Sequence, residues 1–249
     1  PFLGAVFVFT TLLIAIPSAV KAFNYLTTLW QGNIRMTPAM LFSIGLVSTF
    51  VTGGVTGIIL ADSALDVQVH DTYFVVAHFH IVMGMSAIFG MLGGVYHWFP
   101  KMFGRMMNTK MGYAHFWITL VCGFGVFFPM HFIGLNGAPR RYYAYSEFEY
   151  LQATVDLNVL ISVFAIVGAI GQVIFLFNFF YSAFRGQRAV ENPWKSNTLE
   201  WTTPVEHVHG NWPGALPVVH RWPYDYSNPS YEEDFVPQTV PLKEGEEAH

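Results

Sequence analysis

The sequence predicts an all-α fold, a polytopic membrane helix bundle with five transmembrane helices, and three observations support it. The 249-residue chain is 53% hydrophobic and only 11% charged, whereas soluble domains carry about 25% charged residues. Five long segments contain no Asp, Glu, Lys or Arg, and about 20 apolar residues suffice to cross hydrocarbon roughly 30 Å thick. A single cysteine excludes a disulfide framework. The composition therefore excludes an ordinary soluble globule.

The uncharged segments define the spans in order along the chain. The first is interrupted by Lys21, but its apolar character resumes as far as Trp30. Each of the other four exceeds the length that a span requires. Gly and Pro recur inside them, as membrane helices tolerate. We predict spanning helices near 2–30, 38–61, 73–99, 112–134 and 156–184.

The charges between the spans predict their orientation. The loops after the first and third spans, and the stretch after the fifth, contain Lys and Arg with no acid before Glu191. The other two loops contain six acids, with only Arg140 and Arg141 as bases. Because basic loops stay on the cytoplasmic side, we expect the stretch after the fifth span on that side and the acidic loops outside.

The composition of the chain changes near residue 190. Residues 1–189 carry nine basic and six acidic residues, whereas residues 190–249 carry three basic and ten acidic ones, with eight of the 14 prolines. Such a segment is poorly suited to a large core. We predict a membrane domain over 1–189 and an acidic, Pro- and aromatic-rich cytoplasmic tail over 190–249, extended on partner subunits or in solvent. Because the chain starts inside a hydrophobic helix without Met, we expect the C-terminal portion of a longer polytopic protein.

Two histidines, His78 and His80, lie within the third predicted span, where ionisable groups are costly and usually functional. Residues i and i+2 of a helix are about 200° apart, so the two imidazoles must point to nearly opposite sides and cannot chelate one metal ion. Neutral imidazole is a common axial heme ligand. The pattern favours two flat cofactors flanking one helix, with Phe79 turned in a third direction. The alternative is two buried histidines hydrogen-bonded to other helices.

Charged residues near the outer ends of the spans form two further candidate sites. His70 and Asp71 suit a divalent ion such as Mg or Mn, completed by water and another chain. Alternatively, Asp71 caps the start of the helix. Arg140 and Arg141 suit bidentate pairing with carboxylates. Heme propionates, nearby glutamates and lipid phosphates are the alternative partners of the two arginines.

Lys21 lies deep in the first span, about nine residues or roughly 13 Å from Trp30. It either snorkels toward the inner surface or belongs to a proton route, with Ser18 on the same helix face. No Walker loop, Rossmann glycine pattern, nucleophile elbow or basic nucleic-acid patch is present in the sequence. We interpret the other histidines of the spans as structural; they are His97, His115 and His131.

The segment 70–80, His-Asp-Thr-Tyr-Phe-Val-Val-Ala-His-Phe-His, resembles subunit I of the heme–copper oxidases of the cytochrome c oxidase type. The likeness runs from residue 1 to about 189, and beyond 190 it is confined to short stretches. It implies a larger subunit of about twelve helices, of which this chain holds five. The other matching signatures occur in family order at 16–21, 32–35, 53–57, 65–66, 97–100 and 139–142.

The resemblance implies roles for the residues of the third span. His78 would be the proximal ligand of the high-spin heme, where oxygen is reduced. His80 would be one axial ligand of the low-spin heme, whose second ligand would lie upstream of this chain, and Phe79 would lie between the two hemes. His70 and Asp71 would bind Mg or Mn with a further ligand from subunit II.

The resemblance also implies roles outside that span. Arg140 and Arg141 would pair with heme propionates, and Asp66 would lie near the same groups. Lys21 and Ser18 would belong to a proton route from the inner side. Ser18 stands where the family commonly has Thr, which keeps a hydroxyl. The copper ligands would lie upstream.

The function implied by the resemblance is that of a catalytic core subunit of a proton-pumping terminal oxidase. Such an enzyme reduces oxygen to water with electrons from cytochrome c, and this fragment is not expected to be active alone. A quinol oxidase of the same superfamily is the alternative, and a heme-free transporter is a remote one. Asp71 after His70 favours the cytochrome c type.

The resemblance implies cofactors, partners and a location as well. The expected cofactors are two hemes of the A type, copper, and Mg or Mn. The expected partners are subunit II with its dinuclear copper, subunit III, cytochrome c, oxygen and membrane lipid, and no nucleic acid. The expected location is an inner membrane, that of a bacterial cell.

Overall fold

The computed structural model describes residues 2–145, 147–204, 210–212, 214–226, 228–233 and 235–246. Within these ranges all regular elements are helical, and the only β pairing consists of isolated bridges. The prediction of an all-α fold is therefore confirmed. Contacts divide the chain into two compact units, Pro1–His97 with Asn108–Phe180, and Trp98–Met107 with Tyr181–His249.

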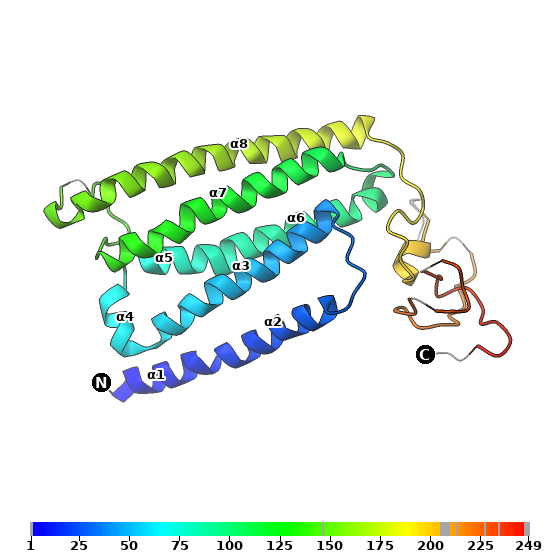
Figure 1. Cartoon of the computed structure of the whole chain (residues 1–249), viewed down its shortest axis with the longest axis horizontal. Helices are drawn as coiled ribbons and strands as arrows, with labels where there is room; N and C mark the ends of the chain where they lie inside the picture. The colour runs from blue at the N-terminus through cyan, green and yellow to red at the C-terminus, as the bar shows by residue number, and fades with distance from the viewer. Residues whose placement is uncertain are drawn as a thin grey trace. The chain divides into compact units, whose positions relative to one another are not determined.

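The helices of the first unit run side by side (Figure 1). Five stretches are long and apolar enough to cross a membrane: Val6–Leu29, Pro38–Ala61, Tyr73–Phe103, Thr109–Leu135 and Glu149–Arg185. The five predicted spans are thus confirmed as helices. The elements in chain order are α1 (Phe2–Leu13), α2 (Ala15–Leu29), α3 (Pro38–Ala61), α4 (Ser63–Val69), α5 (Tyr73–Phe79), the π-helix η1 (His80–Met85), α6 (Ser86–Phe103), α7 (Thr109–Leu135), the 3₁₀-helix η2 (Glu149–Thr154), α8 (Val155–Arg185) and the 3₁₀-helix η3 (Leu199–Thr202).

Polar residues determine where several helices begin. The side chain of Thr37 accepts a hydrogen bond from the backbone N–H of Met40 at the start of α3. Thr72 does the same for α5, with its oxygen 3.2 Å from the nitrogen of Phe74. These are ordinary N-caps. Because Thr72 caps α5, the alternative interpretation of Asp71 as the cap is wrong.

The first predicted span is interrupted, since α1 ends at Leu13 and α2 begins at Ala15. Pro17 explains the break, because it has no N–H to donate to the carbonyl of Leu13 and its ring crowds that carbonyl. Beside the break, the backbone N–H of Ile14 donates to the carbonyl oxygen of Thr11, three residues earlier, at 3.1 Å. The span predicted near 2–30 is therefore present, with an interruption of one residue at Ile14.

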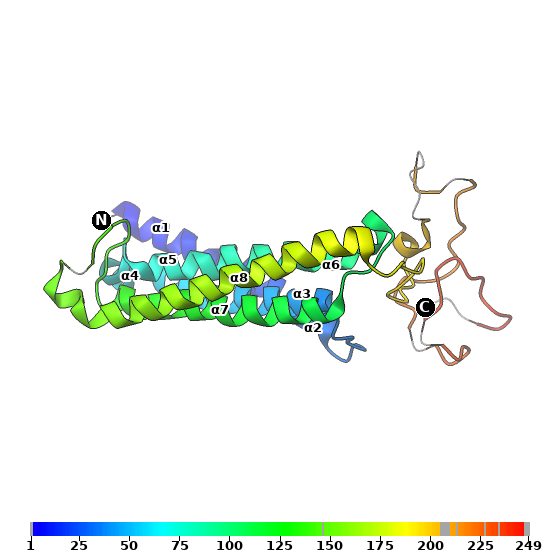
Figure 2. The ribbon, with the colours of Figure 1, turned by 90° about the horizontal axis from the view of Figure 1, so that it is seen from above.

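Glycines allow the central helices to approach closely. A Cβ on Gly53 of α3 would lie 2.5 Å from the backbone nitrogen of Val82 in η1. A Cβ on Gly134 of α7 would collide with the backbone nitrogen of Phe74 in α5. Small residues at such positions are typical of membrane helix interfaces. They bring α3 and α7 against the α5–η1 segment, and Figure 2 shows these helices running lengthwise together.

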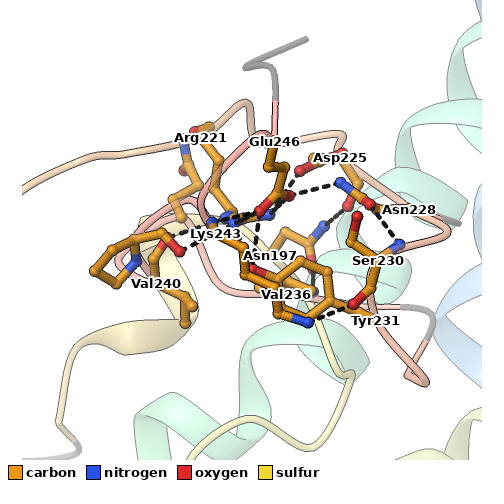
Figure 3. Close-up of polar contacts among 12 residues, drawn as sticks. Asn197, Arg221, Asp225, Asn228, Ser230, Tyr231, Val236, Val240, Lys243 and Glu246 are labelled. Atoms are coloured by element: carbon orange, nitrogen blue, oxygen red, sulfur yellow. Dashed lines mark hydrogen bonds and ion pairs between the residues drawn. The ribbon is translucent and has the colours of Figure 1, made fainter.

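The second unit is organised around the fully buried side chain of Arg221 (Figure 3). Its Nη1 donates to Asp225 and to Glu246, at 2.9 Å each, and its Nη2 donates to the hydroxyl of Tyr231 at 2.8 Å. Asn197 is also buried and donates to the carbonyl of Asp225. This compact polar core differs from the extended tail that the composition predicts, because buried ion pairs and hydrogen bonds order a segment with few apolar residues.

Candidate functional site

His78 near the end of α5 is held against α3. Its Nδ1 lies 2.9 Å from the carbonyl oxygen of Gly53 and 3.0 Å from the hydroxyl of Thr56. A Cβ on Gly57 would lie 2.8 Å from Cε1 of the imidazole, so glycine leaves room for the ring. Because a carbonyl only accepts, Nδ1 carries the proton and Nε2 of the neutral ring keeps a lone pair.

His80, the first residue of η1, is held in a second direction. Its Nδ1 donates to the carbonyl oxygen of Val76 at 2.8 Å, so its Nε2 also keeps a lone pair. Its ring stacks on Phe127 of α7, with centroids 4.6 Å apart and planes 13° apart. Among the described residues, Nε2 of neither His78 nor His80 has a hydrogen-bond partner.

The two imidazoles therefore contact different helices, α3 for His78 and α7 for His80. Phe79 between them is 36% exposed. The helix changes from α to π at His80, and such π segments often occur at functional sites. An imidazole with Nδ1–H fixed by a carbonyl and Nε2 unpaired is oriented as axial metal ligands are.

Nε2 of His131 is a further buried polar atom that lacks a partner within the described residues. His131 donates from Nδ1 to the carbonyl of Phe128, and its ring meets Phe74, one turn before His78, edge-on at 4.8 Å. Buried polar atoms without partners require explanation. Together with the free Nε2 atoms of the His pair, this atom fits a site completed by polar groups that this chain does not supply, and the residues present fit heme.

A charged cluster gathers just before α5. His70 Nδ1 lies 3.3 Å from Asp66, and His70 Nε2 lies 3.8 Å from Asp71. The other oxygen of Asp71 accepts hydrogen bonds from Arg140, through Nε at 2.6 Å and through Nη2. The hydrogen bond from Arg140 is the main cause that lowers the pKa of Asp71 below its usual value. The structure thus brings together four of the predicted site residues.

The arrangement of this cluster bears on one interpretation of the arginines, which is pairing with the nearby glutamates. Arg140 pairs with Asp71, and no ion pair to Glu147 or Glu149 occurs in the described structure. Arg141 is exposed, at a φ of 71°, without an ion pair to any described residue. Among the residues that the structure describes, no group of three or more His, Cys, Asp or Glu residues is placed to hold a metal ion. An ion at His70 and Asp71 would need ligands from elsewhere, as the sequence analysis expects.

Lys21 and Ser18 lie on α2, of which no described residue is buried. Nζ of Lys21 lies 5.2 Å from the ring centroid of Tyr25. The hydroxyl of Ser18 donates to the carbonyl of Ile14 at 2.9 Å. A proton route through these residues stays a prediction.

His115 is a structural residue, as predicted. Its ring is fully buried. Its Nδ1 lies 3.2 Å from the hydroxyl of Tyr96, and its Nε2 lies 3.2 Å from Oε1 of Gln172 on α8. With a partner on each nitrogen, His115 joins α6, α7 and α8 in the core of the first unit.

Sequence reasoning missed the residues of α3 that hold His78, which are Gly53, Thr56 and Gly57. A signal for them exists, because Gly53 and Gly57 form a small-xxx-small pattern that marks close helix approach.

Comparisons with known proteins agree with this site. A family model described as "Cytochrome C and Quinol oxidase polypeptide I" matches residues 1–202. "Alternative cytochrome c oxidase subunit 1" of Bradyrhizobium diazoefficiens is 47% identical over 247 residues, which cover 98% of this chain and 42% of that protein. "Cytochrome c oxidase subunit 1" of Thermostichus vulcanus is 44% identical over 227 residues, covering 91% of this chain and 40% of that protein. The chain thus spans less than half the length of these curated relatives.

A solved structure shares the fold. It is a cryo-EM structure of a heme-copper terminal oxidase dimer, with a TM-score of 0.64 at 20% sequence identity, and the match covers 74% of this chain and 37% of that chain. At this identity the likeness concerns the fold alone. The family match over residues 1–202 is the decisive finding: this chain belongs to the family of cytochrome c and quinol oxidase polypeptide I.

Proposed function

We propose that this chain is the heme-ligating portion of subunit I of a proton-pumping terminal oxidase, which reduces oxygen to water with electrons from cytochrome c. The observation that carries the proposal is the pair His78 and His80, whose rings are fixed against different helices and whose Nε2 atoms have no described partner. Family membership implies heme and copper cofactors and a multi-subunit membrane complex. The membrane setting agrees with the five apolar helices.

The histidines would act as axial ligands on two sides of the α5–η1 segment. His78 would hold the high-spin heme and His80 the low-spin heme, with Phe79 between them. When bound, the hemes supply electron transfer and oxygen chemistry. The chain's own part is to fix each ring, because the carbonyls of Gly53 and Val76 hold the Nδ1 protons and keep both Nε2 atoms free to ligate.

The charged cluster would bind the outer edges of the hemes and a divalent ion. Arg140 and Arg141 would pair with propionates, and Asp66 would lie near the same groups. His70 and Asp71 would bind Mg or Mn, with a further ligand from subunit II. Arg140 bonds to one oxygen of Asp71, and the other oxygen faces His70.

On the inner side, Lys21 and Ser18 would carry protons toward the active site. Both lie on α2, three residues apart and therefore on one face. Placing a Lys within a membrane span costs free energy, and such residues are usually functional.

The finer assignments follow from the resemblance. The hemes would be of the A type, and the partners would be subunit II with dinuclear copper, subunit III, cytochrome c and oxygen. The complex would lie in a bacterial cell membrane with the tail on the cytoplasmic side. The relatives named above support cytochrome c as the electron donor, although the family description also includes quinol oxidases.

Oxygen uptake by the purified complex with its full-length subunit I tests the proposal. We expect uptake with reduced cytochrome c, and a marked loss of turnover in Lys21→Met with both hemes retained. Uptake with a quinol but not with cytochrome c would reassign the donor. A wild-type complex that contains no heme would refute the proposal.

A further inference from the structure

A groove of about 540 Å³ runs between α3 and α7 in the first unit. None of the residues that line it is charged. On α7 the lining extends over seven residues, which is about 10 Å along the helix. The apolar side of the groove includes Leu41 and Ile44 of α3 and Phe116, Trp117 and Leu120 of α7.

The groove opens away from α6 and α8. Phe42 of α3 packs against aromatic rings of α6, and His115 of α7 bonds to side chains of α6 and α8. Ile44 and Trp117 each follow one of these residues by two positions, so they lie on nearly the opposite side of the same helix. Trp117 is accordingly 55% exposed. The described helices therefore leave this face of α3 and α7 uncovered.

One end of the groove is closed by a hydrogen bond and flanked by positive charge. The hydroxyl of Tyr113 donates to the carbonyl oxygen of Met36 at 2.6 Å, which ties α7 to the loop before α3. Arg35 directly precedes Met36, and Lys110 lies one turn before Tyr113 on the same helix face. Both basic residues are exposed. Neither helix, nor the loop that precedes it, contains an Asp or a Glu.

The size of the groove favours an acyl chain over a helix. Both α3 and α7 are long and apolar enough to cross a membrane, so their outward face lies at the depth of lipid chains. A helix with its side chains is about 10–12 Å across, so a 10 Å length of it occupies roughly 800–1,100 Å³. The groove is smaller, at about 540 Å³. A single acyl chain is thinner and can follow the groove along both helices.

We propose that this groove binds one acyl chain of an anionic phospholipid, whose phosphate pairs with Lys110 and Arg35. Arg suits bidentate pairing with phosphate, and Lys acts as a point charge. Basic pockets between membrane helices on the cytoplasmic side are known to bind anionic head groups. The inference goes beyond the proposed function, because it concerns a lipid site on the inner half of α3 and α7 and not the hemes.

Photolabelling of the complete oxidase complex tests the head-group preference. The complex is reconstituted into phosphatidylcholine vesicles that contain a small fraction of phosphatidylglycerol with a diazirine in one acyl chain. A parallel sample contains the same fraction of diazirine-labelled phosphatidylcholine. We expect residues 36–48 and 113–120 to be labelled more strongly by phosphatidylglycerol, and Lys110→Gln to weaken this labelling about fivefold. Arg185→Gln is the control, because Arg185 is an exposed base on α8, which does not line the groove.

A second pair of variants tests the groove itself. Leu120→Trp should fill it and abolish the labelling. Val121→Trp is the matched control, because Val121 is the next residue of α7, is 54% exposed and does not line the groove. Reduced-minus-oxidised spectra check that each variant retains its hemes. If Leu120→Trp loses them, Lys110→Gln decides alone, since Lys110 is exposed.

Three results would overturn the proposal. Equal labelling of the groove by the two lipids, or labelling by phosphatidylglycerol that Lys110→Gln leaves unchanged, would indicate lipid of the general membrane only. Absence of labelling in both segments would indicate that another segment of the full-length subunit or a partner subunit covers the groove. Equal losses in folded Leu120→Trp and Val121→Trp would show that the labelled chain lies outside the groove.

Discussion

The orientation of an imidazole is set by the hydrogen bond that its second nitrogen makes. In His78 this bond runs to the carbonyl of Gly53, and in His80 to the carbonyl of Val76. Helix periodicity alone predicts that the two rings diverge, because residues i and i+2 are on nearly opposite sides. The partners of His78 could not be predicted in this way, since they belong to α3, more than twenty residues earlier in the chain.

Gly57→Ala tests how closely α3 holds His78. The added Cβ would lie 2.8 Å from Cε1 of the imidazole and displace it. We expect binding of the His78-held heme to weaken roughly tenfold, equivalent to about 1.4 kcal/mol of strain. The measurement is the amplitude of the carbon monoxide difference spectrum, divided by the amount of low-spin heme in the same sample. Gly54→Ala is the control, because its Cβ has nothing within 4 Å; equal effects of both variants would refute the argument.

At the scale of elements, the five spans follow from uncharged length because the hydrocarbon excludes charge. The break and the π segment within these spans cannot be predicted from uncharged length. The break at Ile14 depends on Pro17, and Pro is often tolerated inside membrane helices, as it is at Pro129 within α7. The π segment at 80–85 packs against α3 and α7, which the local sequence does not reveal. The pairing of Asp71 with Arg140 could not be predicted because it joins loops that are far apart in sequence.

Gly134→Ala tests the contact between α5 and α7. The new methyl group would collide with the backbone of Phe74, which cannot move as a side chain can. We expect a loss of about 1–3 kcal/mol in stability, larger than the gain of about 1 kcal/mol that alanine brings to a helix. Thermal unfolding of the complex would measure it. An unchanged or higher melting temperature would contradict the close approach.

At the scale of the whole molecule, the chain combines a helical unit with a second unit that contains a buried polar cluster around Arg221. Composition predicts that residues after 190 differ from the membrane part, but not that they fold around Arg221. The buried ion pairs could not be predicted because they join residues as distant in sequence as Arg221 and Glu246. A pattern of hydrophobic residues carries no information about such pairs.

Arg221→Ala tests this polar core. It would leave the carboxylates of Asp225 and Glu246 buried without their partner. Leaving these carboxylates without their partner is unfavourable, so we expect rapid proteolysis of residues 190–246 with the hemes retained. Lys195→Ala is the control, because its exposed pair with Glu233 contributes at most about 1 kcal/mol. Equal protease resistance in the two variants would contradict the account.

The same core predicts a dependence on pH. The hydrogen bond from Arg221 is the main cause that lowers the pKa of Glu246 from 4.5 to about 2. Because the folded state favours the ionised carboxylate of Glu246, this residue stabilises the fold above pH 4.5. The stabilisation is lost as the pH falls toward 2. Cleavage of the tail by an acid-active protease should therefore rise across this window. Glu246→Gln should remove that rise; a rise of the same size in this variant would identify another group.

We propose that His78 and His80 hold two different hemes on two sides of one helix, and optical spectra of the two histidine variants test this. The experiment records reduced-minus-oxidised spectra, with and without carbon monoxide, for the complete complex and for His78→Ala and His80→Ala. We predict two hemes in the wild type, of which only one responds to carbon monoxide. His78→Ala should lose the responsive heme and His80→Ala the other. Loss of the same heme in both variants, or two hemes in each of them, would contradict the claim.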